Sequence, residues 1–288
     1  MESNNIEQLE LDLLIEAIHK RYGYDFRQYA RASLKRRVKN HLTKNDLENI
    51  SELLPIILHD KKRFQVLLFD ISVTVTEMFR DPWFFSSLRE KVLPFLKTFP
   101  YINIWVAGCA TGEEVYSLAI LLIEEGLYKR CQIYATDFNN AALEKARSRI
   151  FPLKDIQKHH RNYLQAGGAH SLTDYYLAQY DAAIFDPSLL KRVTFASHNL
   201  STDSVFGEMN LILCRNVLIY FDHPLQNRVL TLFRNSLRHN GFLCLGSSET
   251  LDFSDVSQHF VNIAHNERIY QYKGATAGLS PQVLEIDR

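Results

Sequence analysis

The chain has 288 residues, which is enough for one large domain or two smaller ones with a substantial buried core. Hydrophobic residues make up 46% and charged residues 23%, as in ordinary globular proteins, and 33 basic and 33 acidic side chains give a formal net charge of zero. A neutral total argues against bulk electrostatic binding to nucleic acid, although it can conceal local patches.

No apolar run reaches the roughly 18–20 residues of a membrane-spanning helix. The first residues show neither the basic lead nor the apolar stretch of an export signal. These patterns favour a cytoplasmic protein that does not insert into a membrane.

Cysteine and histidine give no sign of a metal site or of catalysis. The histidines, including the pair His159 and His160, are predicted to be surface or capping residues. The cysteine spacing matches no zinc pattern, so we expect buried free thiols and no metal. The cysteines are Cys109, Cys131, Cys214 and Cys244.

Residues 1 to about 70 are predicted to be helical, because apolar side chains recur at helical spacing. Within this region, residues 20 to 44 contain nine Lys or Arg side chains and one acid, Asp25. Basic residues at every fourth position would form one stripe of a helix. They are Arg27, Arg31, Lys35 and Lys39. The stripe is either a solvated face or a docking surface for an acidic partner. We favour docking because the segment lacks the acids that usually accompany a solvated helix.

From about residue 100, short apolar strands alternate with helices. The predicted strands are 102–106, 131–136, 193–196, 211–214 and 242–245. The predicted helices are 114–125, 141–149 and 224–239, the last ending at a capping Gly241. This alternation is typical of an α/β domain with a mainly parallel sheet covered on both faces. The segment near 157–192 breaks the rhythm and is predicted to be a small inserted element.

Glycine or polar residues follow four of the predicted strands, at the edge where an open parallel sheet binds ligands. Gly108 and Gly112 would let the backbone approach a ligand closely. Asp137 could accept hydrogen bonds from both hydroxyls of a ribose. Residues 198–200 and 214–216 follow the third and fourth strands.

The glycine turn distinguishes between nucleoside cofactors. A dinucleotide needs Gly-x-Gly-x-x-Gly, but here Ala110 takes the central position. Glu113 and Glu114 also place two negative charges where a pyrophosphate would bind. S-adenosylmethionine has no phosphate, and its sulfonium and ammonium cations tolerate nearby carboxylates. The turn therefore predicts S-adenosylmethionine, with a plain structural turn before a helix as the alternative.

Three motifs resemble the chemotaxis-receptor methyltransferase family, CheR, and the resemblance extends over about residues 5 to 272. Gly-Cys-Ala-Thr-Gly-Glu-Glu-Val-Tyr-Ser stands at 108–117, with Val115 where Pro is common. Leu-Cys-Arg-Asn-Val-Leu-Ile-Tyr-Phe-Asp at 213–222 is the most specific match. Thr-Val-Thr-Glu-Met-Phe-Arg-Asp stands at 74–81, with Thr74 in place of the usual Asn.

The resemblance implies a protein-glutamate O-methyltransferase, and we expect the chain to be a monomer. It implies a Rossmann-like S-adenosylmethionine-dependent methyltransferase domain at 99–275, preceded by a small all-helical N-terminal domain at 1–70. A linker at 71–98 would contribute to the active site, and 276–288 would be a flexible tail. The insertion near 157–192 would be a β-subdomain, which in some members binds a receptor tail peptide.

The resemblance also implies roles for individual residues. Arg80 and Tyr220 would face the methyl transfer, and the basic stripe would meet the acidic methylation helices of a chemoreceptor. The residues implied to contact S-adenosylmethionine are Thr74, Thr76, Arg80, Gly108, Glu114, Asp137, Asn199, Leu200, Cys214 and Arg215.

A substrate glutamate with an ordinary pKa near ~4.3 is already ionised at neutral pH, so transfer needs alignment and no general base or metal. Arg80 could orient that carboxylate, or it could pair with Glu77 or Asp81. Tyr220 could wall the sulfonium, or it could be a core aromatic. Two rival functions stay open. The basic segment suggests an RNA or small-molecule methyltransferase, and Thr74 suggests a non-catalytic module that binds S-adenosylmethionine.

Overall fold

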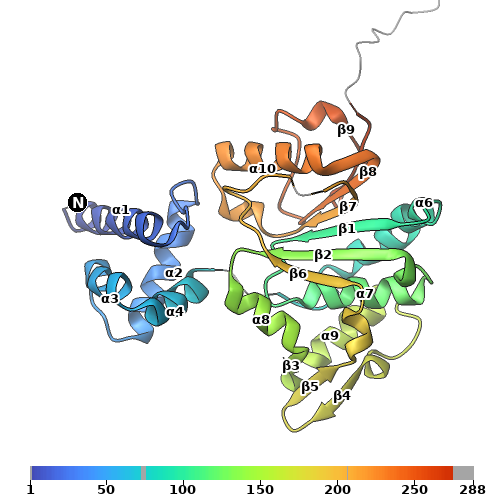
Figure 1. Cartoon of the computed structure of the whole chain (residues 1–288), viewed down its shortest axis with the longest axis horizontal. Coiled ribbons are helices and arrows are strands. Elements are labelled where there is room, and N and C mark those ends of the chain that lie inside the picture. Colours follow the sequence, from blue (N-terminus) through green and yellow to red (C-terminus); the bar gives the residue numbers. More distant parts are fainter. Residues whose placement is uncertain (1, 73–75, 206, 275–288) are drawn as a thin grey trace, which may run out of the picture.

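The computed structural model describes residues 2–72, 76–205 and 207–274, with side chains from residue 5 onward. Thr74 and the expected tail at 276–288 lie outside the described residues. A helical domain comes first, and a seven-stranded sheet with helices on both faces makes up most of the rest of the described chain (Figure 1). No helix in the described part of the chain is both long and apolar enough to cross a bilayer.

The N-terminal helices pack around an apolar core. They are α1 (Glu2–Tyr22), α2 (Arg31–Lys44), α3 (Leu53–His59) and α4 (Lys61–Ile71). The rings of Tyr22 and Phe64 stack with centroids 3.7 Å apart. Asp60 begins α4, because its carboxylate accepts hydrogen bonds from the backbone N–H groups of Lys62 and Arg63.

The predicted basic stripe has acidic partners, so the premise for a docking surface was wrong. Helix α2 begins at Arg31, and Arg27 lies before it and pairs with Asp25 at 2.8 Å. The other acids come from α1, which is distant in sequence but adjacent in space. The ion pairs are Arg31–Asp12 at 2.8 Å, Lys35–Glu7 at 2.7 Å and Lys39–Glu7 at 2.5 Å. Much of this stripe therefore joins two helices of one domain.

The large sheet confirms the predicted α/β, Rossmann-like architecture. Its strand order is β6-β2-β1-β7-β8-β10-β9. The parallel strands are β6 (Val193–Ser197), β2 (Cys131–Asp137), β1 (Ile102–Ala107), β7 (Met209–Cys214) and β8 (Leu237–Leu245). An antiparallel hairpin, β9 (Phe260–Ala264) and β10 (Ile269–Tyr272), completes one edge. This hairpin was not predicted from the sequence.

Helices cover both faces of the sheet, and the core is continuous on each side. Along β1, Ile104 and Val106 face one core, and Trp105 and Ala107 face the other. This alternation follows from the twofold repeat of a strand. The helices of the domain are α5 (Pro82–Ser87), α6 (Leu93–Leu96), α7 (Glu113–Glu124), α8 (Asn140–Ser148) and α10 (His223–Ser236).

A small antiparallel sheet forms the inserted element. Its order is β3-β5-β4, with β3 (Ile150–Pro152), β5 (Ala182–Phe185) and β4 (Tyr176–Gln179) (Figure 1). Along the chain, α9 (Leu153–Gln165) connects β3 to the rest of this element. The element starts before the predicted residue 157, because β3 follows α8 after one left-handed residue, Arg149. Edge-to-face contacts among Tyr116, Phe151 and Phe185 join it to α7.

Two local predictions were wrong, and one was confirmed. Gly241 does not cap α10, because the chain passes directly into β8 at Leu237 and Gly241 lies inside that strand. A Cβ there would lie 2.9 Å from the Arg238 carbonyl oxygen. Two histidines are buried and not at the surface, His41 in α2 and His159 in α9, and burial lowers the pKa of His159. The cysteines are free and buried, as predicted.

Candidate functional site

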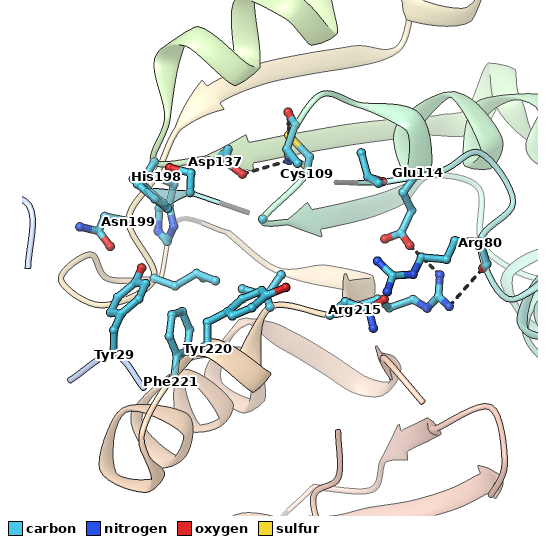
Figure 2. Close-up of a pocket in the computed structure, with 18 of the residues that line it drawn as sticks. Tyr29, Arg80, Cys109, Glu114, Asp137, His198, Asn199, Arg215, Tyr220 and Phe221 are labelled. Carbon is cyan, nitrogen blue, oxygen red and sulfur yellow. Dashed lines mark hydrogen bonds and ion pairs between the residues drawn. The ribbon is translucent and has the colours of Figure 1, made fainter. Parts of the chain in front are cut away.

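A cavity of about 950 Å³, including space open to solvent, lies at the carboxyl edge of the parallel strands and extends to the helical domain. Aromatic, polar and charged side chains line it, as is usual for a small-molecule site. Figure 2 shows Asp137, Cys109 and Glu114 along one side and Tyr29, Phe221 and Tyr220 along the other. Arg80 and Arg215 lie together at one end of this view.

The glycine turn at 108–112 packs directly against Val217, which lies on the opposite wall of the cavity. Gly108 has φ +73°, and a Cβ on it would lie 2.6 Å from a Val217 methyl carbon. Ala110 is also left-handed, with φ 47°, which costs free energy for a residue with a Cβ. Its N–H donates to Asp137 Oδ2 at 2.9 Å, and this bond holds the turn.

Asp137 combines a structural contact with a place in the cavity wall. Besides Ala110, the N–H of Asn139 donates to its Oδ1 at 2.9 Å. Burial raises the pKa of this carboxyl, while the backbone N–H groups act in the opposite sense. Each carboxylate oxygen has a second lone pair, so the group can still accept hydrogen bonds from a ligand.

We expect Asp137→Ala to weaken binding of S-adenosylhomocysteine by about 1.5–3 kcal/mol, the usual range for hydrogen bonds to a charged group. Isothermal calorimetry measures this change. Asp137→Asn keeps one acceptor oxygen and should lose less. Melting without ligand separates any loss of folding stability, and an unchanged affinity in the folded alanine variant would remove Asp137 from ligand binding.

Only one of the two predicted carboxylates at the start of α7 faces the cavity. Glu114 lines it, whereas Glu113 is buried and accepts a hydrogen bond from the Thr111 hydroxyl at 2.7 Å. Burial raises the pKa of Glu113 to about 7, so part of it is uncharged at neutral pH. The expected double negative charge at this site was therefore wrong.

Arg215 joins the linker to the sheet through a buried guanidinium. Its side chain is 2% exposed, and it donates to Glu114 at 2.7 Å and to Asp81 at 2.8 Å. It also donates to the backbone oxygen of Arg80 at 3.2 Å. The guanidinium carbon lies 4.0 Å from the ring centroid of Phe84, which is close enough for a cation–π contact. Arg215 therefore fixes the position of the linker at the cavity.

Arg80 lines the same end of the cavity. The two carboxylates that could have formed an internal salt bridge with it pair with other residues. Glu77 pairs with Lys158 at 2.6 Å, and Asp81 pairs with Arg215. Over the described ranges, no ion pair includes the Arg80 guanidinium. Its charge still acts on Glu77, although less than burial, Lys158 and Asn162 do. Because no ion pair fixes it, the guanidinium can bind a ligand, which favours a site role over the alternative of an internal salt bridge.

The helical domain contributes an arginine to which the sequence alone gave no site role. Arg37 of α2 lies over the Tyr220 ring, 5.0 Å from its centroid. Its guanidinium donates to the backbone oxygens of Ser33, at 3.1 Å, and of Ile71. Desolvation lowers its pKa, and the nearby Tyr220 and Tyr29 hydroxyls act in the opposite sense. Tyr220 is therefore a cavity residue held by the helical domain, not a buried core aromatic.

Most of the predicted site residues meet at this cavity. Those that line it are Thr76, Arg80, Gly108, Glu114, Asp137, Asn199, Leu200, Arg215 and Tyr220. Cys214 does not, because strand alternation turns its side chain with Ile212 into the core beneath α10. We therefore assign the Cys214 side chain no ligand contact, which corrects the prediction. His198 and Asn216 also line the cavity, and both belong to segments that were predicted to lie at this edge. The lining residues with no predicted site role are Tyr29, Arg37, Ser72, Phe138, Val217 and Phe221.

Comparison with known families decides the assignment. A family model described as "CheR methyltransferase, SAM binding domain" matches residues 74–269, and one described as "CheR methyltransferase, all-alpha domain" matches residues 9–72. The chain belongs to the CheR methyltransferase family. The first match assigns to the sheet domain the binding of S-adenosylmethionine, and the second covers the helical domain.

Named relatives agree with this membership. "Putative methyltransferase Cher3" from Pseudomonas putida is 49% identical over 94% of this chain and 99% of its own length. A chemotaxis protein methyltransferase from Borreliella burgdorferi is 30% identical over 86% of this chain and 90% of its own.

Among solved structures, the N-methyltransferase NodS from Bradyrhizobium japonicum with S-adenosyl-l-homocysteine aligns at 16% identity and a TM-score of 0.30. It covers 56% of this chain and 61% of that chain.

Proposed function

We propose that this CheR-family chain transfers the methyl group of S-adenosylmethionine to glutamate side chains of a chemoreceptor-like protein, forming glutamyl methyl esters. The observation that carries the proposal is the Arg80 guanidinium, which lines the cavity beside Glu114 and Arg215 without an ion pair among the described residues. An arginine in this state can bind an incoming carboxylate through two parallel hydrogen bonds.

The cavity residues fit S-adenosylmethionine as the methyl donor, which supplies an activated methyl on a sulfonium. Asp137 would accept hydrogen bonds from the ribose, and the Glu114 carboxylate would lie near the cationic methionyl end. Aromatic side chains can pack against the adenine and the sulfonium. Those that line the cavity are Tyr29, Phe138, Tyr220 and Phe221.

Arg80 and Tyr220 would place the acceptor carboxylate in line with the donor methyl. One O–C bond forms and one C–S bond breaks, and no proton is transferred, because the attacking group is already ionised. Such alignment can lower a barrier by roughly 7–11 kcal/mol. The carboxylate loses its charge in the transition state, so Arg80 must orient it without holding it tightly.

Helix α2 borders the cavity through Arg37, so a receptor helix that delivers a glutamate would pass along α2. The small sheet offers a second contact, because β4 is an edge strand whose Leu177 is 76% exposed. An extended receptor tail could add to that edge. Calorimetric titration with a receptor tail peptide would test this part of the proposal separately.

The main test uses S-adenosylmethionine with a labelled methyl group and the cytoplasmic fragment of a chemoreceptor. We expect label to enter the fragment as base-labile esters that release methanol. A fragment whose candidate glutamates are replaced by aspartate is the control and should take up little label. Absence of transfer to several acidic receptor fragments, while the chain still binds S-adenosylhomocysteine, would contradict the proposal.

The basic segment was the reason to consider an RNA substrate. Acids of α1 pair with the basic residues of the stripe on α2, so that reason is weakened. It would predict strongly salt-dependent RNA binding. The substitution that suggested a non-catalytic module, Thr74, lies outside the described residues. The labelling experiment tests that rival directly, since binding without turnover is its expected result.

A further inference from the structure

Glu249, in the loop after β8, is a buried carboxylate held by backbone groups. The residue is 4% exposed. Oε2 accepts hydrogen bonds from the N–H groups of Gly246 at 2.6 Å and Asn216 at 2.9 Å. Oε1 accepts from those of Val217 at 2.8 Å and Ile219 at 3.3 Å. Over the described ranges no ion pair includes it. Burial raises its pKa, and the converging N–H groups offset part of the cost of burying its charge.

The segment that Glu249 holds is one wall of the cavity. Asn216, Val217 and Tyr220 all line the cavity, and Glu249 accepts from the first two and from Ile219. Asn216 has φ 61°, a left-handed conformation that Asn adopts more readily than most residues but that still costs free energy. The segment therefore depends on contacts that lie outside it.

The same segment determines where the glycine turn can lie. Val217 is the residue that a Cβ on Gly108 would meet at 2.6 Å. A shift of Val217 would thus change the cavity on both walls. Glu249 controls this distance through the Val217 N–H, although it does not line the cavity itself.

Gly246 packs directly against the contact between Glu249 and Asn216, and only a residue without a side chain fits there. A Cβ on Gly246 would lie 2.8 Å from the Asn216 nitrogen and 2.8 Å from Glu249 Oε2. Any larger residue would separate the carboxylate from its donors. A larger residue at 246 would therefore disturb the hydrogen bonds between Glu249 and the 216–219 backbone by steric overlap, and a substitution at 249 would disturb the same bonds by changing the acceptor.

We propose that Glu249 is a positioning residue for methyl transfer, whose carboxylate fixes residues 216–220 so that Val217 and Tyr220 keep their places around the donor methyl. It acts through these residues and touches neither substrate. The inference rests on the proposed function for its kinetic consequence, but its structural consequence can be measured without any receptor.

Hydrogen exchange followed by mass spectrometry tests the structural part in the full chain. Glu249→Gln keeps the shape but turns one acceptor into a donor that faces backbone N–H groups. We expect exchange in a peptide covering 216–219 to become about tenfold faster or more, with little change in β1 or β2. Asp60→Asn is the matched control, since Asp60 also accepts from two backbone N–H groups but at α4. It should leave exchange at 216–219 unchanged.

Kinetics with the receptor fragment test the positioning role. We expect Glu249→Gln to lower kcat about 100-fold, the scale of a misplacement near 1 Å. The KM for the fragment should change less than about threefold, because the substrate-facing groups remain. Affinity for S-adenosylhomocysteine should fall about three- to tenfold, since Asn216 and Val217 line the cavity. Gly246→Ala should reproduce the same pattern, and Asp60→Asn should not.

Each result decides the inference. Wild-type exchange at 216–219 in a folded Glu249→Gln chain overturns it, and so does faster exchange with wild-type kcat and wild-type ligand affinity. If that variant fails to fold, Gly246→Ala and Glu249→Asp supply the same comparisons. Failure of the proposed function shows in the wild-type chain as absent ester formation. Exchange and ligand affinity then still test Glu249.

Discussion

Replacing Arg215 with methionine should lower the free energy of unfolding by about 3–5 kcal/mol, the usual cost of removing one partner from a buried charge network. The guanidinium is 2% exposed and stands between the carboxylates of Glu114 and Asp81, which are 15% and 20% exposed. Methionine fills similar space without charge, so both carboxylates lose their partner. Urea unfolding of the ligand-free chain measures the change.

The same variant should bind S-adenosylhomocysteine at least about tenfold more weakly, because Arg215 also holds the linker backbone at Arg80. Arg215→Lys keeps the charge without the planar fork and should lie between wild type and methionine in both measurements. Adding Glu114→Gln and Asp81→Asn to Arg215→Met removes the unpaired charges, so stability should partly recover while affinity stays low. A methionine variant within about 1 kcal/mol of wild type would contradict the charge network around Arg215.

Arg80→Ala should reduce kcat/KM by about 100-fold or more, because an unaligned carboxylate loses much of the benefit of proximity. Stability should change by no more than about 0.5 kcal/mol, since no ion pair of the described chain includes this guanidinium. Turnover is measured by methyl-ester formation and stability by urea unfolding. Replacing Arg80 should thus reduce turnover with little loss of stability, whereas replacing Arg215 should lower the free energy of unfolding.

Two comparisons define what Arg80 does. Arg80→Lys retains a cation but not two parallel donors, so it should recover only part of the rate if bidentate alignment matters. Arg147→Ala removes an arginine that pairs with Glu144 at the surface, where it is 39% exposed, and should leave turnover unchanged. Wild-type turnover in a folded Arg80→Ala chain would remove Arg80 from the site.

The parallel sheet and its functional edge could be predicted because their signals are local. Each buried strand is a short apolar run, and the residue that follows it marks the same edge in every strand. The sequence was therefore sufficient to predict that Asp137, Gly108 and Arg215 meet at one edge. The predicted ligand roles of Gly108 and Asp137 followed from the glycine turn and from an acid at the end of a strand, whereas the predicted role of Arg215 came from the family resemblance.

Contacts between distant segments could not be predicted in this way. The acids Glu7 and Asp12 belong to the preceding helix, outside the basic segment that they pair with, so the segment appeared unopposed in the sequence. Arg37 belongs to the same helix, but only the packing of that helix against Tyr220 gives it a place at the cavity. The orientation of Glu113 away from the ligand likewise depends on its burial in the fold, which a linear motif does not show.

The bonds between the helical domain and the Tyr220 segment have a mechanical consequence. The N–H of Ala30 donates to the Tyr220 carbonyl at 2.8 Å, and the N–H of Asp222 donates to the Gln28 carbonyl at 2.8 Å. The residues that precede α2 and α10 are thus joined as in a short two-stranded ladder. Under the proposed function, a partner that tilts the helical domain would also move Tyr220, which lines the cavity. We therefore expect docking and catalysis in this chain to be one rigid-body event rather than two.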